Sequence, residues 1–471
     1  MIRKTIASCI AALIFSQVLG CGGRGSQNTP VPAISVTLSP ASATLFLRGT
    51  QTFTASVTGA SDQRVVFEVT GGGSTTTSGV YTAPDRPGDY KIRAWSVADE
   101  TKYAQASIHV EGYRERISDI GTTNDGYDRH TANLVPDGRV LIAGGYGSRG
   151  LHTRADIYVP GQVGVIAGPD LVVPRQAHAS VDLSDGRILL TGGFAVSTSA
   201  NFYDPVFKSS EIYDPVSNRF IAGPEMQWAR REHTMTRLTD GRVLVVGGIS
   251  LHGHGFSANP QAEIYSPSTN RFELAGRNID PRWMHTATRL PDGRVLVAGG
   301  RPNNCIVVCS VDGLKSAEIF DPSTGQWSAT GSMNISRYGH SAALMADGRV
   351  LILGGETTET VGAGDQVLDV EIYDPATGKF TLAGRLIDGR SFHALTELHD
   401  GRYLLAGGNK LSNTPLYTTE IYDPEKGKST PGPEMRDFRV RARSVKLVSG
   451  KVLVIGGHNS GQPVAPLDLF E

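Results

Sequence analysis

The chain has 471 residues, with 45 Lys and Arg against 46 Asp and Glu, and a formal net charge of −1. This length is enough for a large hydrophobic core and for two or three folding units. The balanced charge gives no electrostatic basis for binding nucleic acid, so we expect no nucleic-acid partner.

The first residues have the pattern of an export signal. Arg3-Lys4 precedes an apolar run over residues 6–19, which is shorter than a comfortable membrane span. The sequence Val18-Leu19-Gly20-Cys21 resembles the bacterial lipobox. The resemblance implies a signal peptide over 1–20 and lipidation of Cys21. Because Gly22 follows the cysteine in place of aspartate, it also implies an outer-membrane or cell-surface lipoprotein. An ordinary cleaved signal is the alternative.

Residues 21–32 contain Gly, Ser and Pro and are expected to form a flexible tether. From 33 to 111, short alternating runs are separated by turn residues, at the spacing of a seven-strand β-sandwich. The stretches 49–55 and 79–84 resemble the bacterial Ig-like domains of surface proteins. The resemblance implies an Ig-like spacer over 33–111.

A unit of roughly 50 residues then repeats to the end of the chain. In the copy at 282–331, Arg-x-x-His opens a strand, Asp-Gly follows, a second strand ends in Gly-Gly, and a third strand precedes Asp-Pro. The Gly-Gly pairs are Gly144-Gly145, Gly192-Gly193, Gly247-Gly248, Gly299-Gly300, Gly354-Gly355, Gly407-Gly408 and Gly456-Gly457. Four strand signals per unit predict an all-β fold in which the units are the blades of a β-propeller.

Two features of the unit predict local structure. Asp-Gly between the first two strands favours a two-residue hairpin with a type I′ turn, since both residues of that turn need positive φ. The Val-Leu-Val-type runs before each Gly-Gly are typical of a strand that is buried on both faces.

An aromatic residue follows the Gly-Gly pair near the end of the next strand in most copies: Tyr213, Tyr265, Phe320, Tyr373 and Tyr422. This combination resembles the kelch repeat. The resemblance implies a seven-bladed kelch β-propeller over 113–471, of the galactose oxidase and kelch type. The last copy lacks a fourth strand, and we expect the segment 114–121 to supply it and close the ring.

The loops after the second and fourth strands of each blade share one face of a propeller. That face carries the variable loops, and binding residues concentrate on such loops. The repeated side chains of this candidate binding face are Arg175, His178, Arg230, His233, Arg282, His285, Arg337, His340, Arg390 and His393. Because they recur in nearly every blade, we favour a scaffold role, with each arginine paired to an acid on the third strand.

Other reactive side chains are few. Cys305 and Cys309 lie in one loop and are expected to form a disulfide outside the cytoplasm. His252 and His254 form a His-x-His pair, but no third ligand can be identified, so no metal site is predicted. No catalytic residue or cofactor is assigned.

Two function classes remain open. The first, which we favour, is a cell-envelope lipoprotein that acts as a non-enzymatic interaction module and binds a protein or a glycan. The second is an envelope enzyme that acts on carbohydrate. A galactose-oxidase-like copper site would need two Tyr, two His and a Tyr-linked Cys, and here no Tyr is followed directly by His. A sialic-acid mutarotase-like activity would need only a carboxylate and an arginine near the channel.

Overall fold

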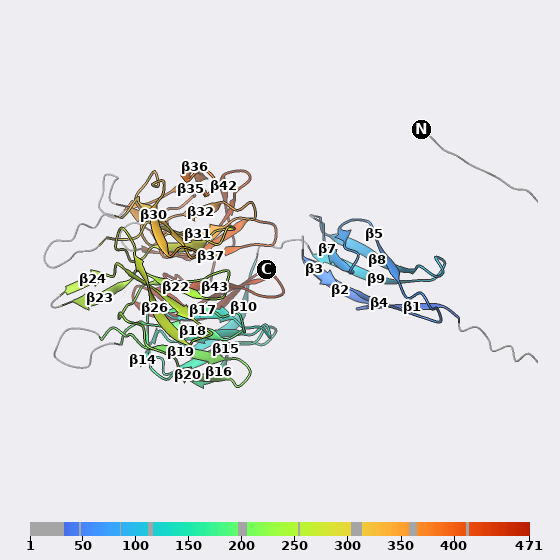
Figure 1. The fold of residues 1–471 in the computed structure, drawn as a ribbon, viewed down its shortest axis with the longest axis horizontal. Coiled ribbons are helices and arrows are strands. Elements are labelled where there is room, and N and C mark those ends of the chain that lie inside the picture. The colour runs from blue at the N-terminus through green and yellow to red at the C-terminus, as the bar shows by residue number, and fades with distance from the viewer. Residues whose placement is uncertain are drawn as a thin grey trace, which may run out of the picture.

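The computed structural model describes residues 33–46, 49–84, 86–111, 116–195, 205–252, 255–302, 313–357, 365–410 and 414–471. Throughout these ranges the regular elements are β-strands and none is a helix (Figure 1). The same residues accordingly contain no helix of the length and hydropathy needed to span a membrane. The predicted signal peptide, Cys21 and the tether lie outside the described residues.

Residues 33–111 form three small sheets around one core. The strands are β1 (Ser35–Ser39), β2 (Ser42–Phe46), β3 (Thr50–Thr52), β4 (Thr54–Thr58), β5 (Val65–Thr70), β6 (Ser74–Thr75), β7 (Val80–Thr82), β8 (Gly88–Ser96) and β9 (Tyr103–Glu111). They pair as β2-β9-β8-β5, β3-β7-β6 and β1-β4. Nine strands are described where the sequence predicted seven. One cause is Phe53, which separates β3 from β4 and donates its N–H to Gly79 O.

The main strands of the described residues from 116 onward form seven four-stranded units, two of which are joined in one eight-stranded sheet. We number these blades 1 to 7. Their inner strands are β11 (Thr131–Leu134), β17 (Ala179–Asp182), β21 (Thr234–Arg237), β27 (Thr286–Arg289), β31 (Ser341–Leu344), β37 (Ala394–Glu397) and β43 (Arg443–Lys446). Each inner strand contacts the inner strands of both neighbouring blades, and β43 contacts β11. The blades therefore close into a ring around a central channel.

The second strands are β12 (Val140–Ala143), β18 (Ile188–Thr191), β22 (Val243–Val246), β28 (Val295–Ala298), β32 (Val350–Leu353), β38 (Tyr403–Ala406) and β44 (Val452–Ile455). Every residue in them is buried, which confirms the prediction of strands covered on both faces. The cores lie between blades, as where Leu141 and Ile157 of blade 1 pack with Ile188 and Tyr213 of blade 2.

The third strands are β15 (Arg154–Tyr158), β19 (Ser210–Asp214), β25 (Gln261–Ser266), β29 (Ala317–Asp321), β35 (Asp369–Asp374), β41 (Thr419–Asp423) and β46 (Gln462–Phe470). The outer strands are β16 (Ile166–Asp170), β20 (Arg219–Ala222), β26 (Arg271–Arg277), β30 (Gln326–Ala329), β36 (Lys379–Arg385), β42 (Lys428–Pro431) and, for blade 7, β10 (Ile117–Tyr127). A single parallel bridge between Arg385 and Lys428 joins the outer strands of blades 5 and 6.

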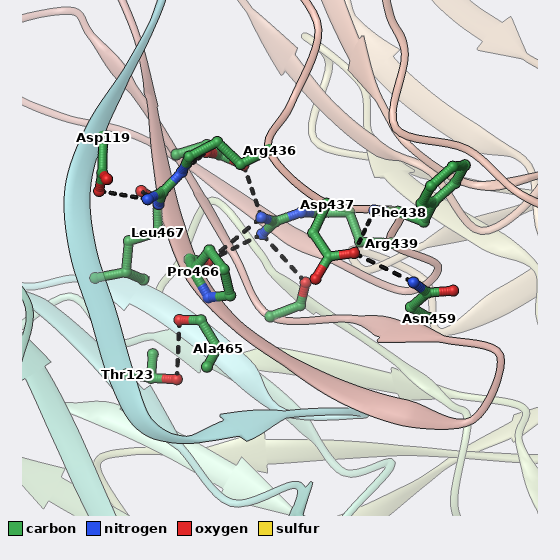
Figure 2. Close-up of polar contacts among 12 residues, drawn as sticks. Asp119, Thr123, Arg436, Asp437, Phe438, Arg439, Asn459, Ala465, Pro466 and Leu467 are labelled. Atoms are coloured by element: carbon green, nitrogen blue, oxygen red, sulfur yellow. Dashed lines mark hydrogen bonds and ion pairs between the residues drawn. The ribbon is translucent and has the colours of Figure 1, made fainter.

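Blade 7 is built from both ends of this part of the chain. In β10, Ile117 pairs with Phe470 and Ser118 with Leu469 of β46. Figure 2 shows how side chains reinforce the pairing: Arg436 bonds to Asp119 and to the carbonyl of Leu467, and Thr123 donates to the carbonyl of Ala465. The early strand thus completes a sheet whose other three strands come from the C-terminus.

Short hairpins follow the second strands on one side of the ring. They are β13 (Tyr146–Gly147) with β14 (Gly150–Leu151), β23 (Ile249–His252) with β24 (Gly255–Ala258), β33 (Glu356–Thr357) with β34 (Asp365–Gln366), and β39 (Asn409–Lys410) with β40 (Thr414–Pro415). In blade 7, β45 (His458–Asn459) pairs with the start of β46. Figure 1 shows β23 and β24 projecting from the ring on this side.

The predicted type I′ hairpin turn is wrong. In the first copy Leu134 pairs with Val140, and Gly138 donates its N–H to Val135 O at 2.9 Å, so the turn includes Pro136 and Asp137. Only Gly138 has a positive φ, of 87°. Asp137 instead accepts the N–H and guanidinium of Arg139, because its side chain can cap the backbone two residues later.

Candidate ligand site at the channel mouth

The repeated arginines are buried in ion pairs with the acids of the third strands. The guanidinium–carboxylate distances are 2.9 Å for Arg175–Glu211, 2.7 Å for Arg230–Glu263, 2.5 Å for Arg282–Glu318, 2.7 Å for Arg337–Glu371, 2.6 Å for Arg390–Glu420 and 2.7 Å for Arg439–Asp468. All six arginines are 0% exposed. The prediction that these arginines pair with the acids is therefore confirmed, and their guanidinium groups do not reach the surface.

Each pair also holds neighbouring backbone in place. In blade 5, Arg337 donates to Gly354 O at 3.0 Å, the carbonyl of the first glycine of a Gly-Gly pair. Glu371 accepts the N–H groups of Asn334 and Ile335, in the segment that enters the blade. Because one side chain pair ties three segments together, its role is to fix the blade and not to contact a ligand.

The repeated histidines interlock neighbouring blades. A Cβ on Gly354 would lie 2.3 Å from Arg390 O and 2.8 Å from the ring of His393 in the next blade, and Gly354 has a φ of 64°. Glycine is needed there because the backbone is left-handed and the histidine fills the space of a side chain. His285 and His340 bond through Nε2 to the hydroxyls of Thr234 and Thr286 in the preceding blades, at 2.9 Å.

These histidines are held neutral. Burial, followed by the nearby arginines, lowers the pKa of His285 and of His393 to about 3. Burial also takes the pKa values of His130, His178, His233 and His340 well below the ordinary range. The edges of all of them except His130 line a pocket in the channel, but their main contacts are between blades.

Two blades depart from the Arg-x-x-His pattern. In blade 7, Arg439 takes the arginine position and Ala442 the histidine position. In blade 1 the arginine position belongs to Tyr127, whose hydroxyl bonds to Asp156, so the acid of this blade has no arginine partner. Arg129, two residues later, is not a scaffold arginine. In each blade with a scaffold arginine, the arginine lies 17 residues before the first glycine of the Gly-Gly pair. This spacing in the sequence identifies Arg439 as the arginine of blade 7.

A ring of left-handed residues surrounds the channel at the Arg-x-x-His end. They stand directly before the histidine position of each blade. They are Arg129, Ala177, Glu232, Met284, Gly339, Phe392 and Arg441, with φ values from 53° to 63°. Backbone hydrogen bonds join neighbours in this ring, as from Ala177 N to Arg129 O at 2.9 Å and from Phe392 N to Gly339 O at 2.8 Å. Hydrogen bonds between blades thus hold a conformation that L-residues ordinarily avoid.

The left-handed ring lines a pocket of about 240 Å³ at the channel mouth, together with Arg443 and the edges of the repeated histidines. Unlike the scaffold positions, its members differ in chemistry from blade to blade. Glu232 and Arg441, from blades 3 and 7, form an ion pair of 2.7 Å, with about a fifth of each side chain exposed. Met284, Gly339 and Phe392, from blades 4 to 6, present an apolar arc.

A second set of variable positions adjoins this ring. In every blade the residue before the ring member forms a bridge with the residue after Gly-Gly. The pairs are Asp128–Tyr146, Gln176–Phe194, Arg231–Ile249, Trp283–Arg301, Tyr338–Glu356, Ser391–Asn409 and Val440–His458. The bridges confirm that the segments after Gly-Gly share a face with Arg-x-x-His.

Aromatic rings and guanidinium groups stack around this mouth. The Arg301 guanidinium lies 5.4 Å from the Trp283 ring and 4.8 Å from the Tyr338 ring, and that of Arg441 lies 4.7 Å from Phe392. Such stacking fixes long side chains and leaves ring edges and guanidinium N–H groups available for contact. The mouth therefore combines planar apolar surface with charged hydrogen-bond donors.

The charge state of the mouth is set by its arginines. Burial acts to raise the pKa of Glu232, but Arg441, Arg129 and Arg231 lower it below its ordinary value. Burial acts to lower the pKa of Arg441, but Glu232, with smaller contributions from Asp128 and Glu356, raises it above its ordinary value. Glu232 is therefore a carboxylate at neutral pH, and it is poorly suited to accept a proton in catalysis.

The remaining predicted sites are not placed. Cys21, Cys305, Cys309 and His254 lie outside the described residues, and of His252 only the backbone, in β23, is described. Among the residues that are described, no three or more His, Cys, Asp or Glu side chains are grouped as a metal site.

No family model matches the chain. It is 27% identical over 319 residues to galactose oxidase of Gibberella zeae, which covers 60% of this chain and 43% of that protein. It is 26% identical over 199 residues to Kelch-like protein 15 of Danio rerio, which covers 38% of this chain and 31% of that protein. The chain thus spans less than half the length of these relatives.

Two solved structures resemble this protein in fold. A fungal alcohol oxidase of the AA5 family, in complex with copper, has a TM-score of 0.57 at 17% identity and covers 75% of each chain. The structure of YjhT has a TM-score of 0.51 at 15% identity and covers 67% of this chain and 99% of that one. The fold is a β-propeller of the kelch and galactose oxidase type. At these identities the likeness extends to the fold alone.

Proposed function

We propose that the protein is an exported, lipid-anchored cell-envelope module that binds a glycan at the channel mouth without changing it chemically. The observation that carries this proposal is that the shared positions of the repeat and its variable positions have different roles. Positions shared by the blades are buried in ion pairs, whereas the left-handed ring differs from blade to blade and lines one pocket. Differences among otherwise equal units are expected where a ligand is recognised.

The chemistry of the pocket favours a sugar over a protein surface. A pocket of about 240 Å³ has the dimensions for one or two sugar residues and not for a broad protein interface. In the pocket, Phe392 supplies aromatic surface and Arg441 supplies donors for hydroxyl or carboxylate oxygens. Beside it, Arg301 stacks on Trp283 and Tyr338. One relative, galactose oxidase, acts on a sugar according to its name.

The anchor rests on the lipobox-like sequence before Cys21, and an outer-membrane or surface location rests on Gly22. The second candidate is an enzyme that acts on carbohydrate, and its support is the likeness to oxidases that share the fold. Against it stands Glu232, whose carboxylate is held by Arg441 and is not free for proton transfer.

A glycan array with protein lacking residues 1–21 tests the proposal. We expect saturable binding to a subset of glycans, which Arg441→Gln weakens at least tenfold because a charge-assisted hydrogen bond contributes about 1.5–3 kcal/mol. Arg289→Gln is the matched control. Arg289 is exposed and lies at the end of inner strand β27 beside an Asp-Gly turn, away from the Arg-x-x-His end that holds the pocket. Absence of binding to any glycan would refute the proposal, and turnover of a bound sugar, followed by NMR, would replace it with the enzyme.

A further inference from the structure

The left-handed ring divides the mouth into two halves of different chemistry. Arg441, Arg443, Arg129 and Glu232 lie in blades 7, 1 and 3, while Met284, Gly339 and Phe392 lie in blades 4 to 6. In ring order, the charged residues of blades 7, 1 and 3 form one arc, interrupted by Ala177 of blade 2, and the apolar residues of blades 4 to 6 form the other. A ligand that matches both arcs has an ionic group at one end and carbon–hydrogen surface at the other.

The charged arc carries an excess of positive charge. Three arginines and one glutamate line the pocket, which gives a formal charge of +2. Arg129 has a partial counter-charge in Asp128, at 3.7 Å. Arg443 donates its Nε–H to the carbonyl of His130, is solvent-accessible within the channel, and has no ion pair among the described residues closer than 4.0 Å. Guanidinium groups in this position are suited to a carboxylate, which they bind with paired hydrogen bonds.

Glu232 shows where a carboxylate is stable. Its Oε1 accepts from Arg441 at 2.7 Å, across the channel from blade 3 to blade 7. Arg129 and Arg231 add favourable charge to the same point. The protein's own carboxylate therefore occupies a position that three arginines make positive. An incoming carboxylate would be attracted to the same guanidinium group.

The apolar arc fixes the other end of the ligand. A Cβ on Gly339 would lie 2.8 Å from the Phe392 ring, so the ring leans over the blade 5 position. Arg441 stacks on Phe392 at 4.7 Å and thereby joins the two arcs. A ring with one carboxylate could place that group on Arg441 and Arg443 while its carbon–hydrogen face packs on Phe392 and Met284.

We infer that the ligand of this mouth is a carboxylate-bearing sugar, and that Glu232 competes with the sugar's carboxylate for Arg441. This inference rests on the proposed function and adds the class of ligand and a competing group. It implies opposite effects of two neighbouring substitutions. Removing the charge of Glu232 should strengthen binding, whereas removing the charge of Arg443 should weaken it.

Isothermal titration of the protein lacking residues 1–21 tests this inference, with D-glucuronate and D-galacturonate against D-glucose and D-galactose. We expect at least one uronate to bind about tenfold or more tightly than its neutral parent, since a charged hydrogen bond contributes about 1.5–3 kcal/mol. Glu232→Gln should raise uronate affinity several-fold, and Arg443→Gln should lower it about tenfold. Arg289→Gln should leave it unchanged, and melting curves verify that each variant is folded.

The outcomes separate the two proposals. Equal affinity for uronates and neutral hexoses would overturn the ligand class and leave glycan binding intact. Loss of uronate affinity in Glu232→Gln would overturn the competition, because it would show that Glu232 supports the bound state. If none of the four sugars binds, the inference fails. The glycan array then decides whether the proposed function fails as well.

Discussion

Replacing Arg337 by methionine is expected to lower the free energy of unfolding by about 3–5 kcal/mol, the usual cost of leaving one partner of a buried ion pair alone. Glu371 would keep its bonds to two backbone N–H groups but lose the guanidinium at 2.7 Å, in a site where both side chains are 0% exposed. Chemical denaturation monitored by tryptophan fluorescence measures the change.

Blade 1 supplies the matched control for this prediction. Asp156 occupies the acid position but meets Tyr127 and Asn124 instead of arginine, and burial raises its pKa. Asp156→Asn removes a charge that nothing neutralises, so we expect a change in stability below about 1 kcal/mol. Equal losses in Arg337→Met and Asp156→Asn, or unchanged melting of Arg337→Met, would contradict a scaffold role for the arginines.

Stability is expected to fall steeply as the pH drops below about 6.5. The pKa values of the buried histidines are lowered in the folded protein, to about 3 for His285 and His393. As the pH falls, these histidines therefore take up protons in the unfolded chain before they do so in the folded one. Their contribution to the free energy of unfolding is fully present above the ordinary pKa of 6.5 and is lost between pH 6.5 and about 3. Each such histidine costs about 1.4 kcal/mol per pH unit in that window.

Denaturation curves at pH 7.5, 6.0 and 5.0 test this dependence. Eight described histidines have lowered pKa values, six of them at the repeated histidine position, so the loss of stability per pH unit should exceed what one group can produce. His109→Gln is the control, because its side chain is 56% exposed, and it should leave the slope unchanged. A free energy of unfolding that does not change between pH 7.5 and 5.0 would contradict this account. It would show that the histidines take up protons in the folded protein as readily as in the unfolded chain, and so are not buried between the blades.

Much of the fold follows from local sequence signals. Gly-Gly after a Val-Leu-Val run marks the buried second strand, because only glycine leaves room for the backbone and histidine of the next blade. An acid at a fixed place in the third strand identifies the partner of each arginine. The Asp-Gly pair does not form the predicted turn, because Gly138 alone has a positive φ and Asp137 accepts the N–H of Arg139.

The candidate site was harder to predict than the scaffold. Arg129, Glu232 and Arg441 stand directly before the histidine position, where the repeat has no fixed residue type. Nothing in a single copy of the repeat therefore marks this position as important. Their importance comes from the closing of the ring, which brings residues from blades 1, 3 and 7 to one pocket. Aligning the seven copies at this left-handed position separates the charged residues from the apolar ones.

Arg439 and Arg441 provide the most direct test of the account, since they lie two residues apart and have opposite roles. Arg439 is fully buried and forms an ion pair with Asp468 at 2.7 Å (Figure 2). Arg441 instead lines the channel mouth. The measurement is the melting temperature of each methionine variant with and without saturating D-glucuronate or D-galacturonate. Arg439→Met should melt several degrees lower yet keep the rise on adding ligand. Arg441→Met should lose that rise and melt less far below the unmodified protein, because the ion pair of Arg441 with Glu232 is partly exposed. A ligand-induced rise that survives in Arg441→Met and vanishes in Arg439→Met would contradict the division between scaffold and site.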